Sequence, residues 1–189
     1  MRARSTRVRA IALCGLGVAL AGCNDTAVAP SAPHATLSLT ASVGTTVFTY
    51  DPNAGVTYGL PGGHKIAFPI NAVCDPSLSS YGATEWDKPC APLVAPVAIT
   101  ATTSTDDRGH PYIDFQPALR FVPGAEVVLY VKDKAAADDS TSTIKWCGSD
   151  GTCVDESIDQ PSVATKRDPK NGIVYRLIKH FSGYLISAG

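Results

Sequence analysis

Residues 173–186 read IVYRLIKHFSGYLI, a stretch that contains no proline and is dominated by aliphatic and aromatic side chains. Such residues favour the pleated, half-buried surface of a β-strand. The Asn-Gly pair at 171–172 comes directly before this stretch and is typical of a turn. We therefore expect residues 173–186 to form the closing strand of a β-rich domain.

Six shorter segments upstream have the same character and are separated by clusters of glycine, proline, aspartate and asparagine. The 14 prolines and 16 glycines of the chain leave little room for long helices. The stretch 135–137 has helix-forming residues but is too short for a stable helix by itself. The pattern predicts an all-β fold, an antiparallel β-sandwich or a barrel. The expected strands are residues 45–50, 64–70, 96–102, 111–115, 126–131 and 143–147.

The first 22 residues have the organisation of a secretory signal. Four arginines precede an apolar run that is too short to span a bilayer, and small residues end it. The segment closes in Leu20-Ala21-Gly22-Cys23, which resembles the bacterial lipobox. This resemblance implies that the signal is cut before Cys23 and that fatty acids such as palmitate are attached to this cysteine. The alternative is an ordinary secretory signal with an accidental cysteine near its end.

A lipid on Cys23 would make the membrane a partner of the mature chain. Several acyl chains on one residue give a stable anchor, since each buried methylene adds about 0.8 kcal/mol. We expect the protein in the bacterial cell envelope. Asn24 differs from the aspartate that marks inner-membrane lipoproteins, so the outer membrane is favoured if the cell has two.

The composition predicts one domain behind a tether. Residues 1–22 are the expected signal, residues 23–40 the acylated terminus and a flexible tether, and residues 41–189 the β-sandwich domain. Loss of the four signal arginines takes the formal net charge from −1 to −5. This charge gives no reason to expect a nucleic acid as a partner, and no later apolar run has the length of a transmembrane helix.

Cysteine usage agrees with export. One cysteine lies in the signal and one in the lipobox, and the remaining four allow three pairings. The segment WCGSDGTC, residues 146–153, is typical of a hairpin whose Asp-Gly turn brings its two cysteines face to face. The alternative is a four-thiolate zinc site, but the usual Cys-x2-Cys spacing is missing, so we expect neither a metal nor a cofactor. The predicted disulfides are Cys74–Cys90 and Cys147–Cys153.

Three segments together resemble a ZU5-type β-sandwich over about residues 60–187. The first is PGGHKIAFPINAV (61–73), in which a glycine pair leads into a strand and a turn. The second is DFQPALRF (114–121), which precedes the apolar run VVLYV (127–131). The third is the tripeptide His-Phe-Ser at 180–182. The resemblance implies a β-sandwich, which is also what the strand pattern predicts.

Some ZU5 domains cleave themselves between the Phe and Ser of this tripeptide, which implies a candidate cleavage site between Phe181 and Ser182. Residues two apart in a strand share a face, so His180 would lie beside Ser182 and could act as its general base. The Ser182 hydroxyl would attack the Phe181 carbonyl carbon, and water would hydrolyse the resulting ester. The alternative is that His180 and Ser182 are polar residues beside a buried Phe181. We favour this structural interpretation, because strand alternation explains it and the cut would release only an octapeptide.

The loop between the first two predicted disulfide cysteines is a second candidate site. It contains Tyr81 and Trp86, aromatic residues of the kind that stack on sugars or anchor partner proteins. The alternative, which we favour because tryptophan is rarely left exposed, is that Trp86 covers the hydrophobic core. The acidic pairs at 106–107 and 138–139 lack the spacing of a calcium loop, so we predict no calcium site.

Three functions are compatible with these sequence features. The first choice is a membrane-anchored structural or interaction module that binds an envelope protein or polysaccharide. The alternatives are an autoproteolytic module that cuts between Phe181 and Ser182, and a carbohydrate-binding module that uses Tyr81 and Trp86. No motif of an enzyme with a diffusible substrate is present, so we expect no enzyme activity other than self-cleavage.

Overall fold

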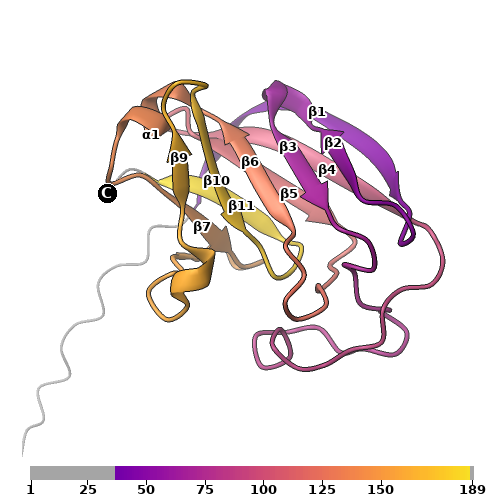
Figure 1. Cartoon of the computed structure of the whole chain (residues 1–189). Coiled ribbons are helices and arrows are strands. Elements are labelled where there is room, and N and C mark those ends of the chain that lie inside the picture. The colour runs from indigo at the N-terminus through magenta and orange to yellow at the C-terminus, as the bar shows by residue number, and fades with distance from the viewer. Residues whose placement is uncertain (1–36, 188–189) are drawn as a thin grey trace, which may run out of the picture. The chain divides into compact units, whose positions relative to one another are not determined.

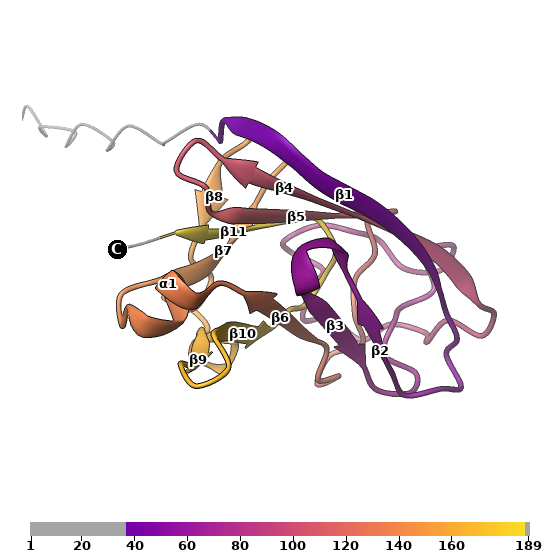
Figure 2. The same ribbon diagram turned by 90° about the horizontal axis from the view of Figure 1, so that it is seen from above.

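The computed structural model describes residues 37–187, which form two antiparallel sheets (Figure 1). The first sheet has the strand order β1 (Leu39–Tyr50), β4 (Val97–Asp106), β5 (Pro111–Gln116), β11 (Gly183–Ser187), β7 (Thr143–Cys147) and β8 (Cys153–Val154). The second sheet has the order β2 (Val56–Gly59), β3 (Lys65–Phe68), β6 (Val128–Lys132), β10 (Ile173–Leu177) and β9 (Lys166–Asp168). Figure 2 shows the sheets as two layers, which confirms the predicted β-sandwich.

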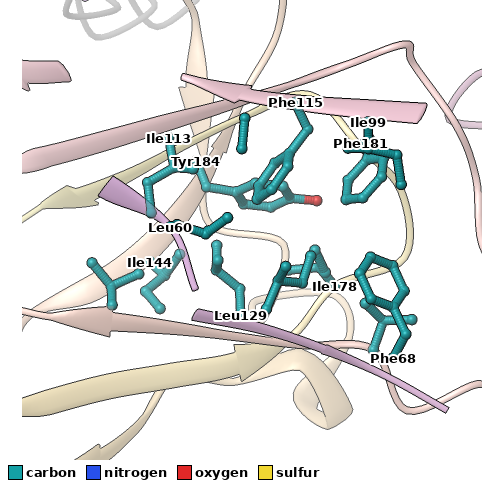
Figure 3. Packing of buried hydrophobic residues seen from close by; sticks show 14 of the residues in the cluster. Leu60, Phe68, Ile99, Ile113, Phe115, Leu129, Ile144, Ile178, Phe181 and Tyr184 are labelled. Atoms are coloured by element: carbon teal, nitrogen blue, oxygen red, sulfur yellow. The ribbon is translucent and has the colours of Figure 1, made fainter. Parts of the chain in front are cut away.

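The hydrophobic core lies between the two layers. Alternation along each strand turns every second side chain inward, as in β4, where Ile99, Ala101 and Thr103 are fully buried. Figure 3 shows aromatic and aliphatic side chains packed in this space. Those labelled there are Leu60, Phe68, Ile99, Ile113, Phe115, Leu129, Ile144, Ile178, Phe181 and Tyr184.

Most of the strands agree with the sequence pattern. Strand β7 has the predicted bounds, and β3, β4, β5 and β6 overlap the predicted segments with shifts at their ends. Strands β2 and β9 were not predicted, because each has four residues or fewer and too little alternation to be recognised. Strand β8 is the short second arm of the hairpin predicted at 146–153. The helix-prone stretch forms the short helix α1 (Lys134–Asp138), which Asp133 caps by accepting a hydrogen bond from the Ala136 amide. Two 3₁₀ turns, Pro61–Gly63 and Pro161–Val163, complete the described elements.

The prediction of one closing strand over 173–186 is wrong. Strand β10 pairs with β6 and β9 in the second sheet, whereas β11 pairs with β5 and β7 in the first sheet. Residues 178–182 therefore cross from one layer to the other. The hydrophobic pattern does not reveal this break, because both halves and the crossing itself contribute buried side chains to the same core.

The amino-terminal expectations fall mostly outside the described residues. The signal, Cys23 and most of the predicted tether lie before residue 37. The predicted tether ends at residue 40, but β1 begins at Leu39. Among residues 37–187, no helix has the length and hydropathy needed to cross a membrane.

Candidate functional site

The candidate site is the crossing segment 178–182, which the neighbouring segment 119–121 holds in place. The Phe181 amide donates to the Leu119 carbonyl over 2.6 Å, and the Phe121 amide donates to the Lys179 carbonyl over 2.8 Å. The Phe181 side chain is fully buried and stacks on Phe115, with ring centroids 4.6 Å apart. The peptide bond between Phe181 and Ser182 is thus anchored on one side by backbone pairing and by the core.

The Ser182 hydroxyl lies within reach of an imidazole. Its Oγ is 3.4 Å from His180 Nδ1. On another side, Trp146 Nε1 donates a hydrogen bond to the same Oγ over 2.5 Å. The indole N–H is a donor only, so Ser182 Oγ accepts from Trp146 and its own proton is free to point at His180 Nδ1.

His180 is held by Glu156 from its other ring nitrogen. The distance from His180 Nε2 to Glu156 Oε1 is 3.3 Å, and His180 is fully buried. With a carboxylate beside Nε2, the proton of a neutral imidazole belongs on Nε2, which leaves Nδ1 as the acceptor that faces Ser182. The three side chains form a serine, histidine and carboxylate series of the kind that activates a hydroxyl nucleophile.

A buried arginine fixes the carboxylate. Arg176 Nη2 lies 2.7 Å from Glu156 Oε2, and Arg176 Nη1 donates to the Ile144 carbonyl over 2.8 Å. Burial raises the pKa of Glu156, but the hydrogen bond from His180 and the charge of Arg176 outweigh it, so the net pKa is lowered. Glu156 is therefore ionised at neutral pH, as its role beside an imidazole requires.

The electrostatic environment keeps His180 neutral. Burial lowers the pKa of His180, and the opposing effect of Glu156 does not cancel this shift. A neutral imidazole at pH 7 is the form that can take a proton from a hydroxyl.

The disulfide-closed loop 74–90 reaches the same place. Tyr81 Oη donates to the Phe181 carbonyl oxygen over 2.5 Å and lies 3.4 Å from His180 Nδ1. Trp86 stacks flat on the His180 ring, with centroids 3.6 Å apart and planes 20° apart. The loop therefore covers the imidazole and touches the carbonyl of the candidate peptide bond.

The sequence-predicted residues come together in part as expected. His180 and Ser182 contact each other and Phe181 is buried. The expectation that they share one face of a strand is wrong, however, because residues 180–182 belong to the crossing between the sheets.

The loop aromatics do not form an open pair, and Trp86 is buried, as the favoured structural interpretation predicts. Trp86 is only 7% exposed and its face is covered by His180, so it offers no free surface for stacking on sugars. Tyr81 is 43% exposed, but its hydroxyl points at Phe181.

Three site residues were missed by sequence reasoning: Trp146, Glu156 and Arg176. Glu156 is 24 residues before His180 and follows an ordinary acidic turn residue, so no spacing links the two. The clearest available signal is Arg176, a charged residue in the middle of an apolar run, because a buried charge requires a partner.

The two predicted disulfides, Cys74–Cys90 and Cys147–Cys153, are both present. Within residues 37–187 no group of three or more histidine, cysteine, aspartate or glutamate side chains has the arrangement of a metal site.

Comparison of the chain with models of protein families, with curated proteins and with solved structures gives no match.

Proposed function

We propose that this domain cleaves its own peptide bond between Phe181 and Ser182. The observation that carries the proposal is the continuous line from Ser182 Oγ to His180 Nδ1 and from His180 Nε2 to Glu156. These contacts favour the autoproteolytic alternative over the purely structural interpretation of the tripeptide.

In the first step, the Ser182 Oγ–H proton moves to His180 Nδ1, and Oγ attacks the Phe181 carbonyl carbon through a five-membered ring. When the tetrahedral intermediate collapses, the bond from this carbon to the Ser182 nitrogen breaks, and His180 returns the proton to the nitrogen. The product is an ester between Phe181 and the Ser182 hydroxyl. Water then adds to the ester, which leaves a carboxylate on Phe181 and restores the Ser182 hydroxyl.

Self-cleavage fits this site better than hydrolysis of a separate substrate. His180 is fully buried and Trp86 stacks on its ring, so the imidazole presents no exposed surface to a separate substrate. The carbonyl next to Ser182, in contrast, is already part of the site. Ser182 itself is half-buried, which allows water to reach the ester.

The cut would leave the carboxyl-terminal piece bound. Strand β11 begins at Gly183 and pairs with β5 on one side and β7 on the other. The peptide that starts at Ser182 would therefore stay in the first sheet after cleavage, so the cut is visible only after denaturation.

Trapping of the ester tests this mechanism. Hydroxylamine attacks esters faster than amides, so adding it to uncut protein should accelerate cleavage and leave a hydroxamate on Phe181. The Ser182→Ala variant cannot form the ester and should not respond. Equal behaviour of the wild type and this variant would overturn the proposal.

We also propose that the chain is a lipoprotein anchored in the cell envelope through Cys23. The lipobox-like segment supports this, and so do two disulfides, because such bonds persist in oxidising compartments outside the cytoplasm. Mass spectrometry of protein extracted from membranes should find acylated Cys23 as the first residue. Protein that keeps Met1 or carries no lipid would contradict the anchor.

A binding function for an acidic polysaccharide is a second candidate, favoured by a groove of about 300 Å³ on the second sheet. Tyr130 lines this groove and stacks on Tyr175, with ring centroids 5.5 Å apart. In the strand register, Tyr130 lies opposite Lys65 and Tyr175 lies opposite Lys166. Such a row can stack on sugar rings and pair with their acidic groups. The groove is lined by Thr57, Gly63, Lys65, Tyr130, Lys132 and Ile173.

Titration with a polyuronate tests this binding function. We expect salt-sensitive binding that is lost in a Tyr130→Ala, Lys65→Ala double variant, and no binding of a neutral polysaccharide. Polyuronate binding that the double variant retains would contradict the assignment.

A further inference from the structure

The contact between Tyr81 and Phe181 joins residues 100 positions apart in the chain. Tyr81 belongs to a loop that the Cys74–Cys90 disulfide closes, and its Oη donates to the Phe181 carbonyl oxygen over 2.5 Å. This oxygen is the atom that becomes negatively charged when Ser182 Oγ attacks. A donor that already points at it is what an oxyanion requires, because no reorganisation is needed during the reaction.

The state of the phenol agrees with a donor role. Burial raises the pKa of Tyr81, and this effect is larger than the lowering of the pKa by the hydrogen bond with Ser182. The hydroxyl therefore stays protonated at neutral pH. Its single proton is directed to the closest acceptor, Phe181 O. The one proton of Ser182 can point at Tyr81 Oη or at His180 Nδ1, and the attack uses the second orientation.

The loop is fixed to the same segment that holds the cleavage site. Arg120 Nη1 donates to the carbonyls of Glu85 and Lys88, each over 2.7 Å, and Asp87 forms an ion pair with Lys179.

The backbone also connects the loop to the cleavage site. The Cys74 amide donates to the Arg120 carbonyl over 3.0 Å, and Arg120 in turn pairs with His180 in an isolated β-bridge. The disulfide closes this connection and limits how far Tyr81 can move from Phe181.

We propose that Tyr81 is a catalytic residue that stabilises the oxyanion of the cleavage reaction, and that full activity requires the Cys74–Cys90 disulfide to hold it there. This inference rests on the proposed self-cleavage. As the bond from Ser182 Oγ to the carbonyl carbon forms, the electron pair of the C=O bond moves to the oxygen and is stabilised by the Tyr81 O–H. When the electron pair returns, the C–N bond breaks, and Tyr81 keeps its proton throughout. Cleavage would then follow disulfide formation, and so would follow export from a reducing compartment.

Tyr81→Phe tests the catalytic role, because this substitution removes only the hydroxyl. Tyr58→Phe is a matched control, since Tyr58 Oη also donates to a backbone carbonyl, that of Thr49, over 2.5 Å. The full chain is followed by denaturing mass spectrometry, and thermal unfolding confirms that each variant is folded. We expect Tyr81→Phe to cleave at least about 100-fold more slowly than the wild type, the cost of losing one oxyanion donor. We expect Tyr58→Phe to cleave at the wild-type rate.

The disulfide requirement is tested with two double variants. The first, Cys74→Ala with Cys90→Ala, lacks the disulfide of the loop. The second, Cys147→Ala with Cys153→Ala, lacks the other disulfide and serves as the comparison. We expect slower cleavage in the first double variant than in the second. Equal rates in these two variants would overturn the disulfide requirement. Equal rates in Tyr81→Phe and the wild type would overturn the catalytic role while self-cleavage stands. A wild type that never cleaves would instead overturn the proposed function itself.

Discussion

Trp146 Nε1 donates a hydrogen bond to Ser182 Oγ over 2.5 Å. This bond fixes the position of the hydroxyl and occupies one of its two lone pairs, so the other lone pair is left for attack on the carbonyl carbon. Trp146 is also edge-on to His180, with ring centroids 5.4 Å apart. The tryptophan thus positions the proposed nucleophile against its base without contacting the carbonyl that is attacked.

Replacing this tryptophan should slow cleavage without abolishing it. We expect Trp146→Phe to cleave roughly fivefold more slowly, since one hydrogen bond of about 1 kcal/mol that orients Ser182 is lost. The rate is measured by denaturing mass spectrometry. A positioning role predicts that the pH profile keeps its shape while its height falls. An unchanged rate would show that the hydrogen bond does not orient the hydroxyl.

Glu156→Gln should slow cleavage by about 100-fold or more, because the carboxylate that sets the His180 tautomer becomes a neutral amide. The variant also leaves Arg176 without its anionic partner, so thermal unfolding must confirm that it is folded. Glu126→Gln is the matched control, because Glu126 lies outside the contacts that hold His180 and Ser182. Equal cleavage by the two glutamine variants would remove Glu156 from the mechanism.

The pH dependence of cleavage should reflect a buried histidine. Burial lowers the pKa of His180, so Nδ1 stays unprotonated to a lower pH than in a free histidine, whose pKa is about 6.5. We expect the cleavage rate to be constant near neutral pH and to fall only below about 6.5. A midpoint at or above that value would contradict a desolvated His180 as the general base.

Gly183→Ala should destabilise the fold. A Cβ at this position would lie 2.5 Å from Cε2 and Cζ of Tyr112, and closer still to the Tyr112 hydroxyl. Moving a packed tyrosine ring is expected to lower the free energy of unfolding by about 1–3 kcal/mol. Gly59→Ala is the control, because a Cβ at Gly59 has no heavy atom within 4 Å. Chemical denaturation measures both, and equal stabilities would contradict the close packing of Tyr112 on Gly183.

His64 should make the fold sensitive to acid. Burial lowers the pKa of His64 to about 4, and its Nδ1 accepts a hydrogen bond from the Lys132 amide over 2.9 Å. Between pH 6.5 and about 4 the unfolded chain binds a proton at this histidine that the folded chain does not. The free energy of unfolding should therefore fall by up to about 3 kcal/mol as the pH drops through this range.

Chemical denaturation across this pH range, carried out in a Ser182→Ala background, measures the acid sensitivity. We expect the slope of stability against pH to be smaller when His64 is replaced by glutamine. The same slope with and without His64 would contradict the assignment.

Much of the fold could be predicted from the sequence, because alternation of buried and exposed residues marks the longer strands. The two cystines were also predictable, since the segment 146–153 has the pattern of a hairpin. The crossing between the sheets at 178–182 was not, because a segment that passes through the core has the same apolar character as a strand inside it. Only the strand pairing in the structure shows that β10 and β11 belong to different sheets.

The candidate site was predictable only where its residues are neighbours in sequence. His180 and Ser182 were identified from one tripeptide. Glu156 and Trp146 come from other parts of the chain, and their approach to His180 depends on tertiary packing that no local pattern encodes. Tyr81 was identified as an aromatic loop residue, but its hydroxyl contact with Phe181 could not be foreseen without the path of the loop.

Self-cleavage is tested most directly by the mass of the folded, purified wild-type protein after denaturation, compared with Ser182→Ala. We predict that the wild type separates into a large piece ending at Phe181 and a small peptide beginning at Ser182, while the variant stays whole. A wild-type chain that remains intact for days at neutral pH with both disulfides formed would contradict the central claim.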